Sequence, residues 1–504
     1  MIMDFAQFIL EHDGDDLGRL ALARDRYAGQ VEDFDLALNT LEARRKLRGK
    51  VPEFVALPQL RFPFKLSAEQ CSSTETARYK ASVALAACGF TPAPSNRAEN
   101  AGTEVFSDIG TVKIGQKCGR PYRLADLTGG LGVDSWAFAQ VFTEVLYNEM
   151  RPELADAARH NLAAMGLTNI TVRNCTLVTS GMTEEGRADV ASAVSDATSF
   201  NIIMAGSDRP SPARTVSGVL DGFRPDIIFL DPARRAQDGR KVFRLEDCRP
   251  DVLQLLPELF AACPRLLLKL SPMADITLVC KQLQHVKAVH VVAAEGECKE
   301  LLLLLEQNHT GEYGITVYEN GAVMQLPLDQ VQPIFGPRPN LSGGPSPVSM
   351  PQSALESIVS GPGPGGKSRL SPKMDWTRSS EADLDGMILF EPGKALLKAG
   401  AFELPCGYGL EKLDRHTHLY VGAAVPEALK PFGKVFEILE VAPLNNRSIK
   451  DIGQRYPSAE VTARNLPLTS DELRKKLGVS SGGSIHIFGC TAHQERQLLV
   501  VEAK

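Results

Sequence analysis

The sequence predicts an α/β fold, in which a mostly parallel sheet follows a helical N-terminal region and precedes a small α+β domain. From about residue 105, short apolar segments alternate with helical ones, the pattern of a parallel sheet with helices on its faces. Residues 1–69 instead repeat leucine and alanine at three- and four-residue steps, as in LALNTLEARRKL, which indicates helices. Residues 381–504 return to alternating strand-like and helical segments.

Length and composition restrict the function classes. The chain has 504 residues, too many for a single core, and its net charge of −6 gives no overall nucleic-acid signature. The N-terminal stretch MIMDFAQFILEHDGDD is acidic where a secretory signal is basic, and no apolar run reaches membrane-spanning length. The 10 cysteines form no C-x-x-C pair, which indicates reduced thiols in the cytoplasm. We expect no metal, since the pair His416 and His418 is ordinary for a strand.

The helical region ends with CSSTETARYKASVALAACGF at 71–90, which predicts one long helix. Ser72 and Glu75 have the spacing of a capping box, so we expect this helix to begin there.

Five strands are expected in the main sheet: PYRLADL, TEVLYNE, ITVRN, PDIIFLDP and RLLLKLSP. AVHVVAAE and KELLLLLEQ follow, separated only by GEC, and so short a connection predicts an antiparallel hairpin. Residues 281–335 could instead form a small α+β subdomain, because periodicity does not separate these options. Residues 176–222, rich in small polar residues, are expected to be an insertion.

Residues 336–380 have the Gly/Pro/Ser-rich composition of a linker. MILF then predicts a strand entering the helix EPGKALLKAGAF, with Pro392 near its first turn. In the tail, KVFEILEV, AEVTARNL, GSIHIFGC and RQLLVVEA are expected strands. NRSIKDIGQRY and TSDELRKKLG are expected helices, the latter opened by the capping box Thr469-x-x-Glu472.

The tail also carries basic residues that would suit RNA, although a solvated surface explains them equally well. They are Arg447, Lys450, Arg464, Arg474, Lys475 and Lys476.

The stretch DLTGGLGVDS at 126–135 places a glycine-rich turn between the first strand and a helix. It lacks the third glycine of the dinucleotide fingerprint, where Ser135 stands instead. Such a turn, with an acid after the next strand (Glu149), predicts an adenosine-type ligand. Asp126 discriminates between ligands, because its carboxylate would repel a pyrophosphate but attract the ammonium group of S-adenosylmethionine (SAM).

The second group of interest is LDPARR, at the end of the fourth strand. Asp231 and Pro232 stand at the sheet edge where open α/β sheets bind ligands, although Asp-Pro is also an ordinary strand-ending turn. The arginines after them could contact phosphates.

Together, the Asp126 motif, Glu149, LDPARR and LLLKLSP resemble a class I SAM-dependent methyltransferase domain, with its Rossmann-like sheet, over about 70–310. CSSTETARYKA resembles the helix start of trimethylguanosine-synthase-like RNA methyltransferases. The tail, with FEPGKALLKAG, GKVFEI and ARNLPLTSDELRKKL, resembles the THUMP-like C-terminal domain of a Bacteroidetes-type methyltransferase family. THUMP domains proper bind RNA, so the resemblance implies an RNA partner, tRNA or rRNA.

The resemblance assigns residues to roles. SAM would be held by Ser73, Thr74, Asp126, Thr128, Gly130, Gly132, Glu149 and Asp208. Catalysis would fall to Asp231, Pro232 and Arg234, and RNA contacts to Arg235, Arg464 and Lys475. The adenine contact stays open between Cys175 and the Asp208 region.

Two departures refine the expected chemistry. Ala233 and Arg234 replace the proline and aromatic residue of amino-group methyltransferases, so stacking on a base must come from elsewhere or be absent. KLSP offers Leu270 and Ser271 where uracil-C5 enzymes carry a nucleophilic cysteine. We therefore expect direct transfer to nitrogen or oxygen, with Asp231 orienting the target or accepting its proton. The alternatives are an NAD(P)-dependent oxidoreductase and a non-catalytic RNA-binding or assembly protein.

Overall fold

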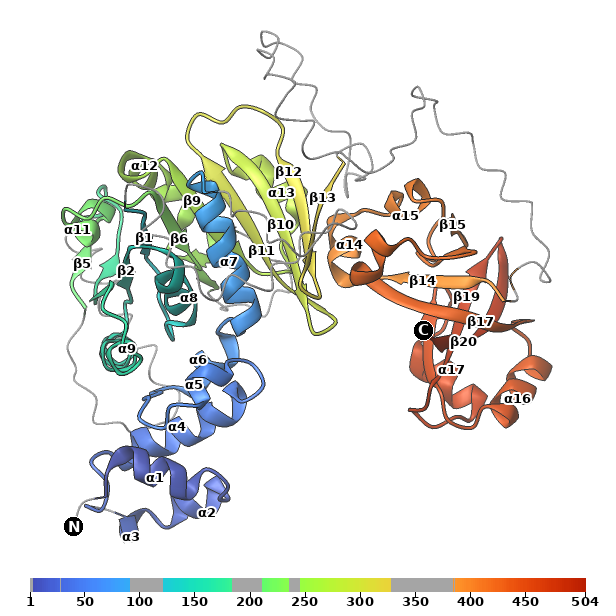
Figure 1. Ribbon diagram of the computed structural model, residues 1–504, viewed down its shortest axis with the longest axis horizontal. Coiled ribbons are helices and arrows are strands. Elements are labelled where there is room, and N and C mark those ends of the chain that lie inside the picture. Colours follow the sequence, from blue (N-terminus) through green and yellow to red (C-terminus); the bar gives the residue numbers. More distant parts are fainter. Residues whose placement is uncertain are drawn as a thin grey trace. The chain divides into compact units, whose positions relative to one another are not determined.

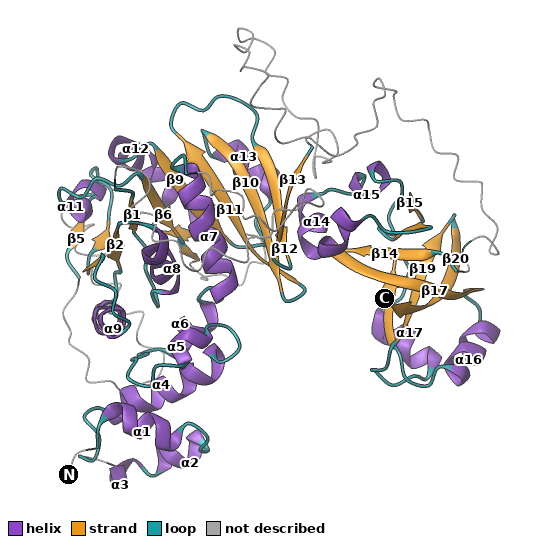
Figure 2. Cartoon of the chain, in the orientation of Figure 1, coloured by secondary structure: helices purple, strands orange, loops and turns teal. Residues whose placement is uncertain are grey.

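The computed structural model describes residues 3–27, 29–90, 121–183, 211–234, 245–327, 384 and 386–504 (Figures 1 and 2). These residues form two compact units. The first runs to residue 314 without the turn at 295–298, and the second comprises that turn and the chain from 315 onward. The expected linker at 336–380 lies outside the described residues.

Short helices form the N-terminal region, and aspartate side chains begin three of them. Asp4, Asp16 and Asp33 each accept hydrogen bonds from backbone N–H groups of the first turn. Phe8, Phe34 and other apolar side chains form a core between these helices. The helices are α1 Phe5–His12, α2 Leu17–Leu22, α3 Arg24–Tyr27, α4 Phe34–Leu47, α5 Pro52–Val55, α6 Lys65–Gln70 and α7 Thr74–Ala87.

The expected capping box at Ser72 is wrong by one residue. Ser73 caps α7, and its hydroxyl accepts a hydrogen bond from the backbone N–H of Thr76. Ser72 is displaced from that role because its hydroxyl donates to Asp134 on another helix, at 2.9 Å.

All five strands expected in the main sheet are present, and they run parallel to one another. The nine-stranded sheet has the order β13-β12-β10-β11-β9-β6-β1-β2-β3. Its strands are β1 Arg123–Asp126, β2 Glu144–Asn148, β3 Ile170–Arg173, β6 Ile227–Leu230, β9 Arg265–Leu270, β10 Val286–Ala294, β11 Glu297–Glu306, β12 Gly314–Glu319 and β13 Ala322–Leu326. In the central strands β1, β2, β6 and β9 most side chains are apolar and buried, as expected for strands covered on both faces, whereas the edge strand β3 is only partly buried.

The expected antiparallel hairpin is β10 and β11, which only Glu295 and Gly296 connect. The second strand of the hairpin, and not the first, pairs with β9: β11 is antiparallel to it, with Leu302 opposite Lys269. β11 therefore lies between β9 and β10, and the hairpin β12–β13 extends the same sheet.

Helices connect the parallel strands, and α7 packs against α8 (Figure 1). These helices are α8 Val133–Val141, α9 Pro152–Ala164, α11 Val216–Leu220, α12 Val252–Ala262 and α13 Ile276–Gln282. Two small strand pairs accompany them, β4 Thr176–Leu177 with β5 Ala213–Arg214 and β7 Ala233–Arg234 with β8 Cys248–Arg249. Of the expected insertion at 176–222, residues 184–210 lie outside the described residues.

The second unit contains a seven-stranded sheet of order β15-β16-β14-β17-β20-β19-β18. Its strands are β14 Ile388–Pro392, β15 Glu411–Lys412, β16 Tyr420–Gly422, β17 Gly433–Pro443, β18 Glu460–Arg464, β19 Ile485–Ala492 and β20 Glu495–Ala503. The helices are α14 Lys394–Ala399, α15 Leu404–Gly407, α16 Asn446–Arg455 and α17 Ser470–Leu477. Apolar side chains of α16 and α17 share a core with those of β19 and β20.

Two details of this unit test the sequence analysis. The capping box of Thr469 and Glu472 is confirmed. Pro392, expected near the first turn of a helix, is the last residue of β14 and directly precedes Gly393, the N-cap of α14. Among the described residues, no helix has the length and apolar character needed to cross a membrane.

Candidate active site

The site begins with the loop between β1 and α8. Gly130 and Gly132 adopt left-handed backbone conformations, with φ of 53° and 86°, which glycine tolerates best. Gly129 has no room for a side chain, since a Cβ atom would lie 2.1 Å from the ring of Tyr147. The glycines are therefore required by conformation and close approach.

The neighbouring strand β2 holds this loop in place. Tyr147 donates a hydrogen bond from its hydroxyl to the carbonyl of Gly130, at 2.6 Å. Glu149, directly after β2, accepts hydrogen bonds from the N–H groups of Gly130 and Arg151, both at 2.9 Å. The structure thus brings Glu149 to the loop. A carboxylate has about four acceptor positions, so it can still receive ribose hydroxyls.

Asp126 lies at the end of β1 with its side chain fully buried. Its carboxylate accepts hydrogen bonds from the Ser135 hydroxyl at 2.5 Å and the Thr128 N–H at 3.0 Å. Burial nevertheless raises the pKa of Asp126 to about 7. Ser135 stands where a dinucleotide fingerprint has glycine, and its hydroxyl binds Asp126, a role that sequence reasoning missed.

Asp231 follows β6 and is joined to the loop. Its backbone N–H donates to the Thr128 hydroxyl at 2.6 Å. Lys269 of β9 donates to the Asp231 carboxylate at 2.5 Å. Sequence reasoning missed Lys269, although a lysine within the otherwise apolar strand RLLLKL was a usable signal.

A chain of buried charges continues from Lys269. Its ammonium lies 3.8 Å from Glu300 of β11, and Glu300 pairs with Lys80 of α7 at 2.6 Å. Lys80 has no exposed side-chain surface and also contacts Asp134 of α8, at 3.2 Å. These contacts link α7, α8, β9 and β11 beside Asp231.

Ser73 and Thr74, expected to close over SAM, are engaged in other contacts. Ser73 caps α7, and the Thr74 hydroxyl donates to Glu53 of α5 at 2.5 Å. The neighbouring Ser72 donates its hydroxyl to Asp134, which also contacts Lys80 of α7.

Of the remaining predicted site residues, the structure describes some and not others. Pro232 is buried, and Arg234 belongs to β7. Cys175 is buried after β3, and its N–H donates to the Asn148 side chain at 3.1 Å. Asp208 and Arg235 lie outside the described residues.

In the second unit, the two predicted RNA contacts differ in their availability. Arg464 pairs with Glu391 at 2.6 Å, whereas Lys475 is exposed on α17. A groove of about 400 Å³ between α16 and α17 is lined by residues that include Lys450 and Lys476.

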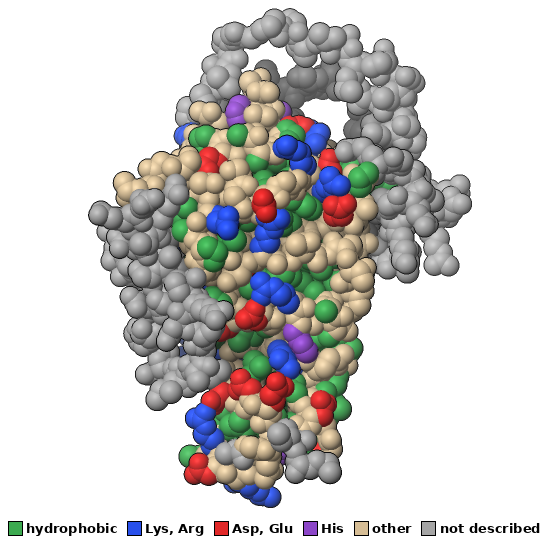
Figure 3. Space-filling model, turned by 90° about the vertical axis from the view of Figure 1, so that its left-hand side faces the viewer, with side chains coloured by type: hydrophobic (Ala, Val, Ile, Leu, Met, Phe, Trp, Pro, Cys, Tyr) green, Lys and Arg blue, Asp and Glu red, His purple; other side chains and the backbone are tan. Residues whose placement is uncertain are grey.

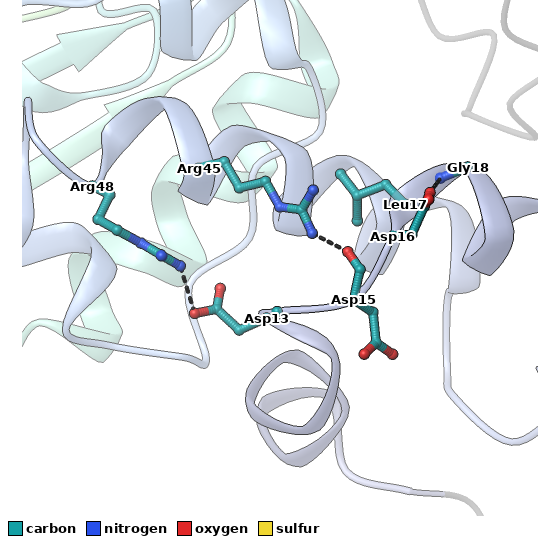
Figure 4. A pocket seen from close by; sticks show the side chains of 8 residues that line it. Asp13, Asp15, Asp16, Leu17, Gly18, Arg45 and Arg48 are labelled. Carbon is teal, nitrogen blue, oxygen red and sulfur yellow. Dashed lines mark hydrogen bonds and ion pairs between the residues drawn. The ribbon is translucent and has the colours of Figure 1, made fainter.

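A larger groove of about 660 Å³ lies in the N-terminal region, away from the loop (Figure 4). Two of its acidic side chains already have partners, because Asp13 pairs with Arg48 and Asp16 caps α2. On the face shown in Figure 3, Lys and Arg are interspersed with Asp and Glu. In the described part of the chain, no group of three His, Cys, Asp or Glu side chains is arranged to hold a metal ion.

Comparison with known proteins identifies two domains in the second unit. A ferredoxin-like domain matches residues 389–428, and a THUMP domain-like family matches residues 433–503. No curated protein matches the sequence.

Among solved structures, a candidate methyltransferase from Porphyromonas gingivalis W83 matches at 25% identity over 100% of both chains, with a TM-score of 0.61. A ribosomal protein L11 methylase from Lactobacillus delbrueckii matches at 13% identity over 38% of this chain and 73% of its own, with a TM-score of 0.22. A Thermus thermophilus 16S rRNA N2 G1207 methyltransferase matches at 16% identity over 38% of both chains, with a TM-score of 0.23.

This chain is accordingly a homologue, over its full length, of a candidate methyltransferase, with a mainly parallel α/β sheet followed by ferredoxin-like and THUMP-like domains.

Proposed function

We propose that the protein is a cytoplasmic SAM-dependent methyltransferase that methylates a nitrogen or oxygen atom of RNA directly. One observation carries the proposal: the buried Asp126, the glycine loop and Glu149 meet beside Asp231 at the carboxyl ends of β1, β2 and β6. In open α/β sheets, ligands bind at this edge.

The residues present fit SAM. Asp126 offers a buried carboxylate to an ammonium group, the loop lets the ligand approach the backbone, and Glu149 offers acceptors to ribose hydroxyls. When bound, SAM supplies a methyl group on a sulfonium, whose sulfur keeps the electron pair of the broken bond. A nicotinamide dinucleotide would instead bring its pyrophosphate to Asp126, which is unfavourable.

The chain's own residues supply orientation and proton acceptance. Asp231 would accept a hydrogen bond from the N–H or O–H of the target and later pass its proton to solvent. Leu270 and Ser271 follow Lys269, so no thiol stands there for a covalent intermediate.

RNA as the acceptor is supported by the THUMP-like domain and by the exposed Lys450, Lys475 and Lys476 around its two helices. A non-catalytic RNA-binding protein would show the same surface, so an experiment must separate the two.

The test compares nucleoside mass profiles of total RNA from cells with and without the protein. We expect one methylated nucleoside to disappear, and Asp231→Ala to fail to restore it. Calorimetry showing that the folded protein does not bind SAM would exclude the proposal, while SAM-independent RNA binding alone would favour the non-catalytic alternative.

A further inference from the structure

We propose that Lys269 is a positioning residue of the acceptor site: its ammonium fixes one oxygen of the Asp231 carboxylate, so that the other oxygen receives the acceptor's N–H or O–H. This inference rests on the proposed methyl transfer and adds a residue to it.

The sheet places the two side chains at the same level. Leu230 of β6 is paired with Leu268 of β9, so Asp231 and Lys269 are the next residues of adjacent parallel strands. Lys269 Nζ lies 2.5 Å from Asp231 Oδ2. Because the backbone N–H of Asp231 is bonded to Thr128, both its main chain and one carboxylate oxygen are held.

Lys269 is less exposed than Asp231, as a positioning role for the lysine requires. The Lys269 side chain is 12% exposed and that of Asp231 is 36% exposed. The lysine is therefore largely covered, while part of the carboxylate remains accessible to another molecule.

Of the acidic side chains that pair with Lys269, Asp231 is the closest. Glu300 is the second ion-pair partner of Lys269, but Glu300 has a closer partner in Lys80, at 2.6 Å against 3.8 Å. Burial favours the neutral amine of Lys269, yet the charges of Asp231 and Glu300 outweigh it and raise its pKa above the ordinary value. Lys269 therefore remains a cation at neutral pH.

This arrangement has a chemical consequence. One oxygen of the Asp231 carboxylate is bound by the Lys269 ammonium, which leaves the other oxygen to accept a hydrogen bond. Fixing its direction fixes the direction of the acceptor lone pair, which in-line transfer requires.

The test measures methyl transfer from labelled SAM to total RNA from cells lacking the protein, at neutral pH. Lys269→Met should lower kcat on the order of tenfold to a hundredfold. The dissociation constant for SAM should stay within about twofold of wild type, well under the tenfold that ~1.4 kcal/mol represents.

Two further variants separate positioning from stability. Lys269→Arg keeps the charge and should restore most of the rate. Lys287→Met removes an exposed lysine of the same sheet, paired with Glu306, and should behave like wild type. An unchanged rate in Lys269→Met, or equal loss of SAM binding and rate, would overturn the inference.

A second measurement needs no activity. With isotope-labelled lysine, the NMR chemical shift of Lys269 at neutral pH, with its signal identified by its absence in Lys269→Met, should change in Asp231→Asn because the ion pair is lost. If wild type methylates no RNA, the proposed function fails, and this chemical shift still decides the inference: a signal unaffected by Asp231→Asn overturns the ion pair and the role of Lys269.

Discussion

Replacing Asp126 by asparagine should stabilise the ligand-free protein and weaken its binding of SAM. The carboxylate is fully buried, and its pKa is raised from 3.8 to about 7. At ~1.4 kcal/mol for each pH unit, ionising this group in the folded state costs about 4 kcal/mol more than in the unfolded chain.

The sign of the pH dependence follows from the raised pKa. The unfolded chain loses this proton first, so the group's contribution to stability is fully present below 3.8 and lost as pH rises through about 7. At pH 8, Asp126→Asn should therefore raise the free energy of unfolding by up to about 4 kcal/mol. Below the pKa of an unfolded aspartate the two proteins should be similar.

SAM binding should show the opposite response. Because the ammonium group pairs with the ionised carboxylate, affinity should rise about tenfold between roughly pH 6 and 8 as Asp126 loses its proton. Asp126→Asn should weaken binding by roughly 1–3 kcal/mol and remove this dependence.

Calorimetry across this pH range, with chemical denaturation of the same samples, tests both statements. Glu149→Gln is the matched control, since it weakens the ribose contact but leaves Asp126 to titrate. The reasoning is refuted if Asp126→Asn retains the pH dependence of SAM binding, or if it is less stable than wild type at pH 8.

Three further changes probe other parts of the molecule. Gly129→Ala introduces a Cβ atom against the ring of Tyr147, so we expect a loss of about 1–3 kcal/mol of stability together with weaker SAM binding in calorimetry. Lys80→Met leaves Glu300 without its closest cation and should destabilise the protein by about 3–5 kcal/mol in urea denaturation. Lys475→Gln should weaken RNA binding similarly for all RNA sequences. In filter binding, the slope of log affinity against log salt concentration should decrease in magnitude by about one.

Each of these changes has a control. Gly49→Ala meets no atom within 4 Å and should leave SAM binding intact. Lys287→Met tests the loss of an exposed lysine in the urea experiment. Arg455→Gln removes a cation that already pairs with Glu440 and should reduce RNA binding less than Lys475→Gln does. Equal effects in a variant and its control would contradict the corresponding prediction.

Local patterns in the sequence predicted the helices and strands, and also the part of the candidate site that consists of the glycine loop, Asp126, Glu149 and Asp231. Alternating apolar strands and helices were sufficient for the parallel sheet, because side-chain burial follows backbone period. Glycines, Asp126 and Glu149 lie within one strand–helix–strand unit, so their proximity follows from chain connectivity. Asp231 could be placed beside them because the carboxyl ends of parallel strands share one edge.

Only the tertiary structure decided which distant side chains meet. Lys269 and Glu300 come from β9 and β11. These strands are neighbours because the second strand of the hairpin, and not the first, pairs with β9. Lys80 of α7 binds Glu300, which lies 220 positions away in the sequence. Ser72 does not cap α7 as expected, because its hydroxyl donates to Asp134. Periodicity records which face a residue buries, not which residue it will contact there, so partners of buried charges emerge only when the elements pack.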